Sequence, residues 1–120
     1  VYKRQVLYIR QSAEENGAYR RRFEVNVRAF NEYRVVDCGF LYGKNMAATD
    51  LVPERVGTTN AQGYTVKQMP AACTPGRKVL RYGSSSATGQ VSARFYITYT
   101  NGVMTKTYLS EVCTYDYDEA

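Results

Sequence analysis

The sequence predicts an all-β fold, an antiparallel β-sandwich of about seven strands. Short segments in which apolar and polar residues alternate recur along the 120-residue chain, and no long stretch shows the 3.6-residue period of a helix. The pair Asn101-Gly102 also joins two runs rich in β-forming residues, which is a strong local signal for a hairpin. A chain of this length suits one domain and can bury a core without metals or disulfides.

The first clear alternation predicts a half-buried strand over 19–30. Its apolar residues fall on one face and its polar residues on the other, as expected where one side of a sheet meets the core. The apolar face consists of Phe23, Val25, Val27 and Ala29, and the polar face consists of Glu24, Asn26 and Arg28.

The segment YRVVDCGFLYG, 33–43, predicts a second strand in the middle of a sheet. Val35 and Leu41 fall on the face opposite the main apolar set, so we expect the strand to be partly covered on both sides. A glycine in mid-strand, Gly39, indicates a close approach of another segment or a bulge. The main apolar set is Val36, Cys38, Phe40 and Tyr42.

The middle of the chain, 43–63, is the least regular part, and Pro53 and Gly57 interrupt it. We expect Met46-Ala47-Ala48 to form a helical turn and Leu51-Val52 to form a short strand. A weak strand should begin near Tyr64 and stop at Pro70, and RKVLRYG, 77–83, should form another short strand.

The C-terminal hairpin is the strongest prediction from the sequence. In 91–100 the residues Ala93, Phe95, Ile97 and Tyr99 alternate with Arg94, Tyr96 and Thr98. Asn101-Gly102 then predicts a type I′ turn, in which both central residues need a positive φ. The run from 103 to 115 is expected to form the returning strand.

Three segments, VVDCGFLYGKN, ARFYITYTNG and TKTYLSEVCTY, resemble the fibronectin type III-like and immunoglobulin-like modules of bacterial cell-surface proteins. Those modules carry a glycine followed by an apolar-x-aromatic step in the third strand, an R-A-Y-like sixth strand and a Y-S-[DE]-V-like last strand. The matching residues are Gly39-Phe40-Leu41-Tyr42, Arg94-Phe95-Tyr96, and Tyr108 with Ser110-Glu111-Val112. The resemblance covers roughly 18–118, departs from the pattern in 45–90, and implies exported modules in tandem that act as spacers or binding platforms.

The first five residues, VYKRQ, resemble a translation of the transposon end sequence used in sequencing libraries. We therefore expect 1–5 to be adapter-derived and not native, 6–17 to be an edge strand or a linker, and 18–118 to be a single β-sandwich domain. Deletion of 1–5 is expected to leave the melting temperature unchanged.

Several residue types and motifs that carry catalysis are missing from the sequence. The chain has no histidine, no C-x-x-C pair and no glycine-rich phosphate loop. We therefore expect no catalytic site, no cofactor and no metal, and we do not expect an enzyme. The acidic tail with Asp116, Asp118 and Glu119 could bind Ca²⁺ weakly, but a solvated linker is favoured. Three cysteines leave at least one free thiol, and we expect buried, inert thiols. A single disulfide is the alternative, and the sequence does not choose among its three possible pairings.

Basic and aromatic residues are the remaining candidates for a binding surface. The run Arg20-Arg21-Arg22 could meet phosphate or an acidic polymer, but a structural role is favoured, at the start of a strand whose edge the long side chains cover. Tyrosines directed away from the core could stack on sugars, bases or a protein partner, but cross-strand pairs that only stabilise the sheet are favoured. The candidates are Arg20, Arg21, Arg22, Arg94, Tyr96, Tyr108 and Tyr115.

The first hypothesis is a non-catalytic extracellular module that acts as a spacer, an adhesion domain or a ligand-presenting domain of a bacterial surface or secreted protein. Its partners would be neighbouring domains of the same longer chain and a cell-surface protein or glycan. The alternative is an RNA-binding coat protein of a small RNA phage. The formal charge of +5 is mild, and no apolar run reaches about 18 residues, so neither nucleic acid nor a membrane span is expected.

Overall fold

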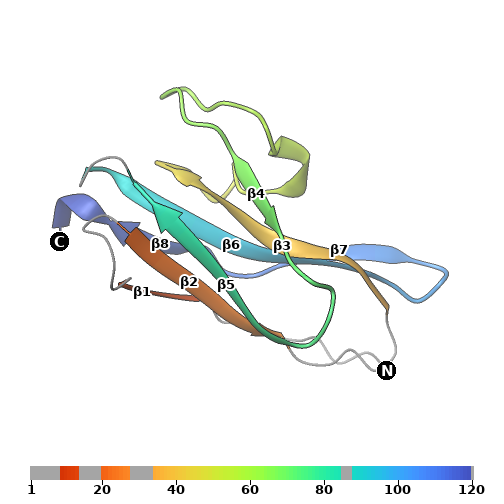
Figure 1. Cartoon of the computed structure of the whole chain (residues 1–120). Coiled ribbons are helices and arrows are strands. Elements are labelled where there is room, and N and C mark those ends of the chain that lie inside the picture. The colour runs from red at the N-terminus through yellow and green to blue at the C-terminus, as the bar shows by residue number, and fades with distance from the viewer. Residues whose placement is uncertain (1–8, 14–19, 28–33, 85–87, 120) are drawn as a thin grey trace.

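The computed structural model describes residues 9–13, 20–27, 34–84 and 88–119, and these form two antiparallel β-sheets packed against each other (Figure 1). The predicted all-β fold class is confirmed, since the described residues contain no α-helix. The segment 1–5, predicted to be adapter-derived, lies outside the described residues.

The smaller sheet has three strands in the order β1-β2-β5, all antiparallel. Its strands are β1 (Arg10–Ala13), β2 (Arg20–Val27) and β5 (Gly76–Gly83). β2 is the central strand, with β1 on one side and β5 on the other.

The larger sheet has the order β4-β3-β6-β7, and β8 also pairs with β6. Its strands are β3 (Arg34–Lys44), β4 (Lys67–Pro70), β6 (Gln90–Thr100), β7 (Thr105–Leu109) and β8 (Cys113–Asp116). Two short 3-10 helices complete the described elements, η1 (Pro53–Arg55) and η2 (Tyr117–Glu119).

The main core lies between the two sheets and is built mostly from their inward-facing residues. The rings of Phe40 and Phe95, on the paired strands β3 and β6, meet edge to face with their centroids 4.9 Å apart. The core consists of Phe23, Val25, Val27, Cys38, Phe40, Leu80, Val91, Ala93, Phe95, Ile97, Tyr99 and Tyr117.

The alternation predicted for the first strand is confirmed in β2. Phe23, Val25 and Val27 are buried, whereas Asn26 is exposed and Glu24 is half-buried on the outer face. The predicted positions Arg28 and Ala29 lie outside the described residues.

The central position of β3 is confirmed, but the predicted inward position of Val36 is wrong. The register shifts between Val35, which pairs with Tyr99, and Asp37, which pairs with Thr98. Val36 is the extra residue of this bulge and is 45% exposed, while Val35 packs against the main core. A bulge inserts one residue into one strand and so reverses its alternation, which a fixed period of two cannot anticipate.

Gly39 marks a close approach between strands, one of the two roles predicted for it. A Cβ atom at this position would overlap the Met69 carbonyl and lie 3.0 Å from the Cα of Pro70 on β4. The bulge lies three residues earlier in β3, so the two features are separate.

The segment between β3 and β4 folds over the outer face of the larger sheet and forms a second core. Leu41 and Tyr96 from the sheet pack with Met46, Leu51 and Val66 from this segment, and all five are buried. The coverage predicted for both faces of β3 is therefore confirmed.

Of the predictions within that segment, the turn is shifted along the chain and the strand is wrong. Met46 is outside the turn, but the carbonyls of Ala47 and Ala48 accept hydrogen bonds from the Asp50 and Leu51 N–H groups at 3.0 and 3.2 Å. Leu51 and Val52 do not form a strand. The Leu51 side chain is buried in the second core, and Pro53 begins η1 directly afterwards. The strands predicted near 64–70 and 77–83 are confirmed as β4 and β5.

The C-terminal hairpin is confirmed, but its turn is not type I′. Thr100 pairs with Thr105, so four residues form the loop, and Gly102 has a φ of 93°. Asn101 does not have a positive φ; its side-chain oxygen instead accepts hydrogen bonds from the Val103 and Met104 N–H groups at 2.9 Å. An asparagine can use its side chain to build such a turn, which a dipeptide signal does not distinguish from a two-residue loop.

The returning segment forms two strands instead of one. Ser110 interrupts it, since its N–H donates to the Phe95 carbonyl and its hydroxyl oxygen accepts from the Phe95 N–H, both at 2.9 Å. The chain then continues past 110–112 into β8, which pairs with the first part of β6.

Candidate functional site: an arginine face on the smaller sheet

Two residues of the predicted arginine run, Arg20 and Arg22, lie on the outer face of β2. The side chains of Phe23 and Val25 point into the core, so the alternating residues Arg20, Arg22 and Glu24 point away from it. The structural explanation for the run, protection of a sheet edge, is wrong because β2 is flanked by β1 and β5.

Arg21, the middle member of the run, is on the inner side of β2. Its guanidinium carbon lies 3.8 Å from the centroid of the Tyr115 ring, and its Nη2 donates to Gln11 of β1. The same contact covers Tyr115, which packs against the main core and against Tyr117. Neither residue belongs to the surface formed by Arg20 and Arg22.

Tyr96 and Tyr108 do not form the predicted outward tyrosine surface. Tyr96 is on the outer face of β6 but is only 1% exposed, because the segment between β3 and β4 covers it. Its hydroxyl donates to the Asp37 carboxylate at 3.3 Å and accepts a hydrogen bond from Gln68. Tyr108 pairs with the inward-facing Ile97 and packs against the main core.

Arg94 stabilises the fold through hydrogen bonds to backbone carbonyls. Its Nε donates to the Ser110 carbonyl at 2.8 Å, and its Nη1 reaches the carbonyls of Ala48 and Leu51 at 3.2 Å. The guanidinium thus satisfies backbone oxygens of the covering segment and of the chain after β7. These hydrogen bonds explain the presence of an arginine at this position, and no ligand is needed to explain it.

The outer face of the smaller sheet gathers arginines from all three strands. We call this surface the arginine face. Its described residues include five arginines and one carboxylate, a net of four positive charges. Its charged residues are Arg10 of β1, Arg20, Arg22 and Glu24 of β2, and Arg77 and Arg81 of β5. Within the described part of the chain, this sheet face is strongly positive.

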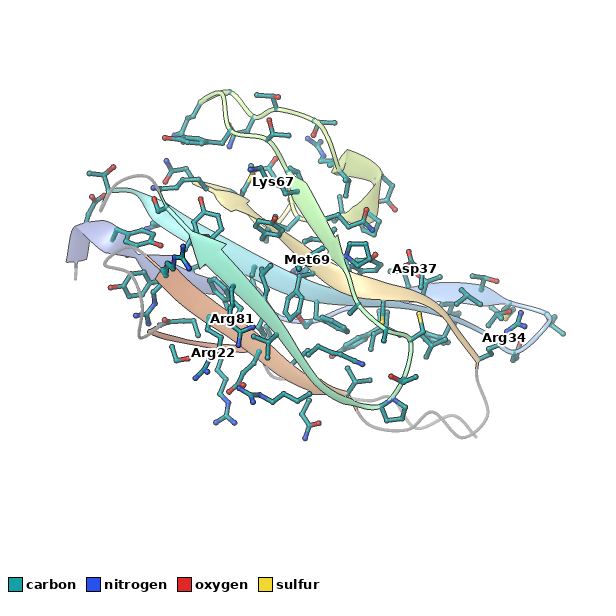
Figure 2. The ribbon with its side chains drawn as sticks, in the orientation of Figure 1. Arg22, Arg34, Asp37, Lys67, Met69 and Arg81 are labelled. Carbon is teal, nitrogen blue, oxygen red and sulfur yellow. The ribbon has the colours of Figure 1, made fainter. Side chains whose placement is uncertain are left out.

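Arg22 and Arg81 occupy directly opposite positions of the β2–β5 ladder (Figure 2). Like charges placed opposite each other in a sheet repel, so this pair adds to the positive potential of the face. The Nε of Arg22 donates to the Ser12 hydroxyl of β1 at 3.2 Å, which orients its guanidinium on the surface.

Glu24 lies among these arginines and binds two of them. Its carboxylate is 2.5 Å from the Nε of Arg77 and 3.7 Å from the Nε of Arg10. The hydrogen bond from Arg77 lowers the pKa of Glu24 below its usual 4.5, with further contributions from the charges of Arg77, Arg10 and Arg22. Glu24 therefore remains ionised at neutral pH and offsets one of the five arginine charges.

Guanidinium groups arrayed on a rigid sheet suit the recognition of carboxylate, sulfate or phosphate groups. Alternate residues repeat roughly every 7 Å along a strand, and neighbouring strands lie roughly 5 Å apart. Each guanidinium can form paired hydrogen bonds to an oxyanion. Among the described residues of this face there is no aromatic side chain on which a base could stack.

Arg10, Arg77 and Arg81 are the members of the arginine face that sequence reasoning missed. The prediction treated 77–83 only as a strand. The inward position of Leu80 places Arg77, Val79 and Arg81 on the opposite face, so the alternation within RKVLRYG already contained this signal. The pairing of β5 with β2 and of β1 with β2 was not available from the sequence.

A second candidate is a small hollow of about 200 Å³ between β4 and β5. Of its two lysines, Lys44 is already engaged, since its ammonium group donates to the Ser84 hydroxyl at 2.7 Å and lies 5.0 Å from the Tyr117 ring centroid. The lining residues are Gly43, Lys44, Gly63, Tyr64, Thr65, Lys67 and Tyr82. The arginine face offers more charge at more positions and is the better candidate.

The acidic residues near the C-terminus form hydrogen bonds within the chain. Asp116 accepts from Gln90 at 3.1 Å and from the Asp118 N–H at 2.9 Å, and Asp118 accepts from the Gly89 N–H at 3.1 Å. Within the described ranges no three histidine, cysteine or acidic side chains gather as a metal site would require. No described helix has the length and apolar character needed to cross a membrane.

Comparisons with protein-family models, with curated proteins and with solved structures found no match to this chain.

Proposed function

We propose that this chain is a non-catalytic immunoglobulin-like or fibronectin type III-like module of a bacterial surface or secreted protein. The strand order supports this assignment. The first, second and fifth strands form one sheet, and the fourth, third, sixth and seventh form the other in that order, with the eighth also paired to the sixth. In the immunoglobulin scheme these correspond to A, B and E packed against C′, C, F and G.

The observation that carries the functional proposal is the arginine face. We assign to it the binding of an acidic polysaccharide that bears carboxylate or sulfate groups. A module with such a surface would act in adhesion or ligand presentation at the cell surface. Five guanidinium groups on three hydrogen-bonded strands hold a fixed pattern of charge, which suits a polymer with repeated anionic groups.

RNA is the competing polyanion, as in the coat-protein alternative. Proteins that bind single-stranded RNA combine cationic grooves with aromatic side chains that stack on the bases. The described part of the arginine face has the cations without the aromatic side chains, which favours a polymer without bases.

The test is a set of titrations with polygalacturonate, dextran sulfate, neutral dextran and poly(U) at several salt concentrations. Binding to the two acidic polysaccharides should weaken as salt increases, and neutral dextran should not bind. The double variant R22Q/R81Q should bind polygalacturonate roughly tenfold more weakly, since each exposed ion pair contributes roughly 0.2–1 kcal/mol.

The matched control is R34Q/K106Q, which removes the same charge from exposed positions of the larger sheet and should change the affinity less than about twofold. An equal loss in both double variants would indicate nonspecific attraction to a basic protein. Stronger binding of poly(U) than of polygalacturonate, or a large particle that carries RNA, would favour the coat-protein alternative.

A further inference from the structure

The three cysteines occupy different environments. Cys38 on β3 is 2% exposed and belongs to the main core. Cys73 is exposed in the loop between β4 and β5, and Cys113 is half-buried at the start of β8. All three are free thiols, and the sequence left their pairing open.

The loop after β4 brings Cys73 to Cys38. The Ala71 N–H donates to the Cys38 carbonyl at 3.0 Å, which extends the pairing of β3 with β4 by one step. The Cys38 Sγ lies 3.6 Å from the Ala71 carbonyl oxygen and 3.3 Å from that of Ala72, the residue joined to Cys73. The neighbouring Cys73 thiol is also among the groups that raise the pKa of Cys38.

Cys113 is too far away to pair with Cys38. Cys38 on β3 pairs with Ile97 of β6, and Cys113 on β8 pairs with Ala93 of β6. β3 and β8 lie on opposite sides of β6. Four residues along a strand span roughly 13 Å. Two cysteines whose Cα atoms lie more than about 7 Å apart do not form a disulfide without movement of the backbone.

We propose that Cys38 and Cys73 form a disulfide under oxidising conditions and that Cys113 remains a free thiol. The bond would join β3 to the β4–β5 loop across the open edge of the sheets. The inference goes beyond the proposed function and does not depend on the arginine face.

Thiol–disulfide exchange with a small disulfide such as oxidised glutathione provides a balanced route. The exposed Cys73, as a thiolate, attacks one glutathione sulfur, so the glutathione disulfide breaks, a Cys73–glutathione bond forms and one glutathione thiolate leaves. Cys38 then attacks the Cys73 sulfur and releases the second glutathione. The two protein thiols lose two electrons to glutathione, and their two protons pass to the solvent or to the released thiolates.

The environments of the two thiols set the order of these steps. Burial raises the pKa of Cys38, and its interaction with the Cys73 thiol raises it further. Cys38 is therefore a poor first nucleophile, whereas Cys73 is open to solvent. Closure of the disulfide by Cys38 should be the slow step, and its rate should rise with pH.

The experiment compares the reduced chain with the same chain equilibrated in glutathione buffers of increasing oxidised fraction. Thiols are counted with a chromogenic reagent after denaturation, and intact mass and peptide mapping identify the bond. The count should fall from three to one, with a mass loss of about 2 Da and a Cys38–Cys73 linked peptide. The melting temperature should rise by roughly 10 °C, because the bond closes a loop of roughly 35 residues.

Two serine variants make the result decisive. Cys113→Ser should still lose two thiols and show the same rise in melting temperature. Cys73→Ser changes an exposed side chain, so it should fold, and it should form no internal disulfide. A wild-type chain that keeps three thiols in fully oxidising buffer, or a linked peptide that contains Cys113, would overturn the proposal.

Discussion

Arg94 on β6 donates a 2.8 Å hydrogen bond from Nε to the carbonyl of Ser110, the residue at which the returning strand is interrupted. Its Nη1 reaches the carbonyls of Ala48 and Leu51 at 3.2 Å. One side chain thus ties the end of β7 and the covering segment to the centre of the larger sheet. Arginine suits this position because its donors are held in a fixed planar fork.

Arg94→Lys should destabilise the protein by roughly 1–3 kcal/mol, although it preserves the charge. A lysine ammonium cannot reproduce the planar set of donors, so at least one carbonyl loses its partner. Urea denaturation followed by tyrosine fluorescence measures the change. Arg34→Lys, at an exposed position of β3, is the control and should change the free energy of unfolding by less than about 0.5 kcal/mol. Equal effects would show that Arg94 does not hold the segment in place.

Gly39→Ala should cost more than about 2 kcal/mol of stability, because the new methyl group would overlap the Met69 carbonyl on β4. The matched control is Gly83→Ala in β5, where the nearest atom to an added Cβ is 3.9 Å away and φ is not positive. That change should be neutral or stabilising by less than about 1 kcal/mol. Thermal unfolding of both variants distinguishes a steric clash specific to Gly39 from a general destabilisation by alanine at glycine positions of the strands.

Glu24 makes the stability depend on pH in a defined direction. Its folded pKa lies below the usual 4.5 because Arg77 donates a hydrogen bond to the carboxylate. The resulting stabilisation is complete above about pH 4.5 and is lost as the pH falls through the lower, folded pKa. The difference in unfolding free energy between the wild type and Glu24→Gln should therefore be larger at pH 7 than at pH 3. Glu54→Gln, outside the sheet, is the control, and a constant difference for Glu24→Gln would contradict the ion pair.

Alternation identified the elements of this fold wherever one side of a strand meets the main core. β2 and β6 follow a period of two, so the buried positions from Phe23 to Val27 and from Ala93 to Tyr99 were predictable. The bulge at Val36 and the interruption at Ser110 were not, because both depend on hydrogen bonds to β6, far away in the sequence.

The candidate site was predicted only in part for the same reason. Arg20 and Arg22 could be found as a run of charge, but Arg81 joins them only through the β2–β5 pairing. Tyr96 was expected to be exposed because it alternates with core residues. It is buried because Leu51, from an irregular segment, covers the second face of the sheet. Contacts made by loops are specified by packing and leave no periodic signal.

Leu51 provides the most direct test that the covering segment belongs to the folded core. It is 0% exposed and packs with Leu41 and Tyr96, so Leu51→Ala should destabilise the protein by roughly 2–5 kcal/mol. Val103→Ala, at the 90% exposed tip of the hairpin, removes an apolar side chain from a loop that buries nothing and should cost less than about 0.5 kcal/mol. Denaturation gives both values, and hydrogen exchange of the Val66 amide, which donates to the Thr58 carbonyl at 2.9 Å, reports on the segment itself. If the segment were a loose loop, Leu51→Ala would resemble Val103→Ala and the Val66 amide would exchange rapidly in both. A large cost together with protection of Val66 in the wild type would establish that this irregular segment forms the second core.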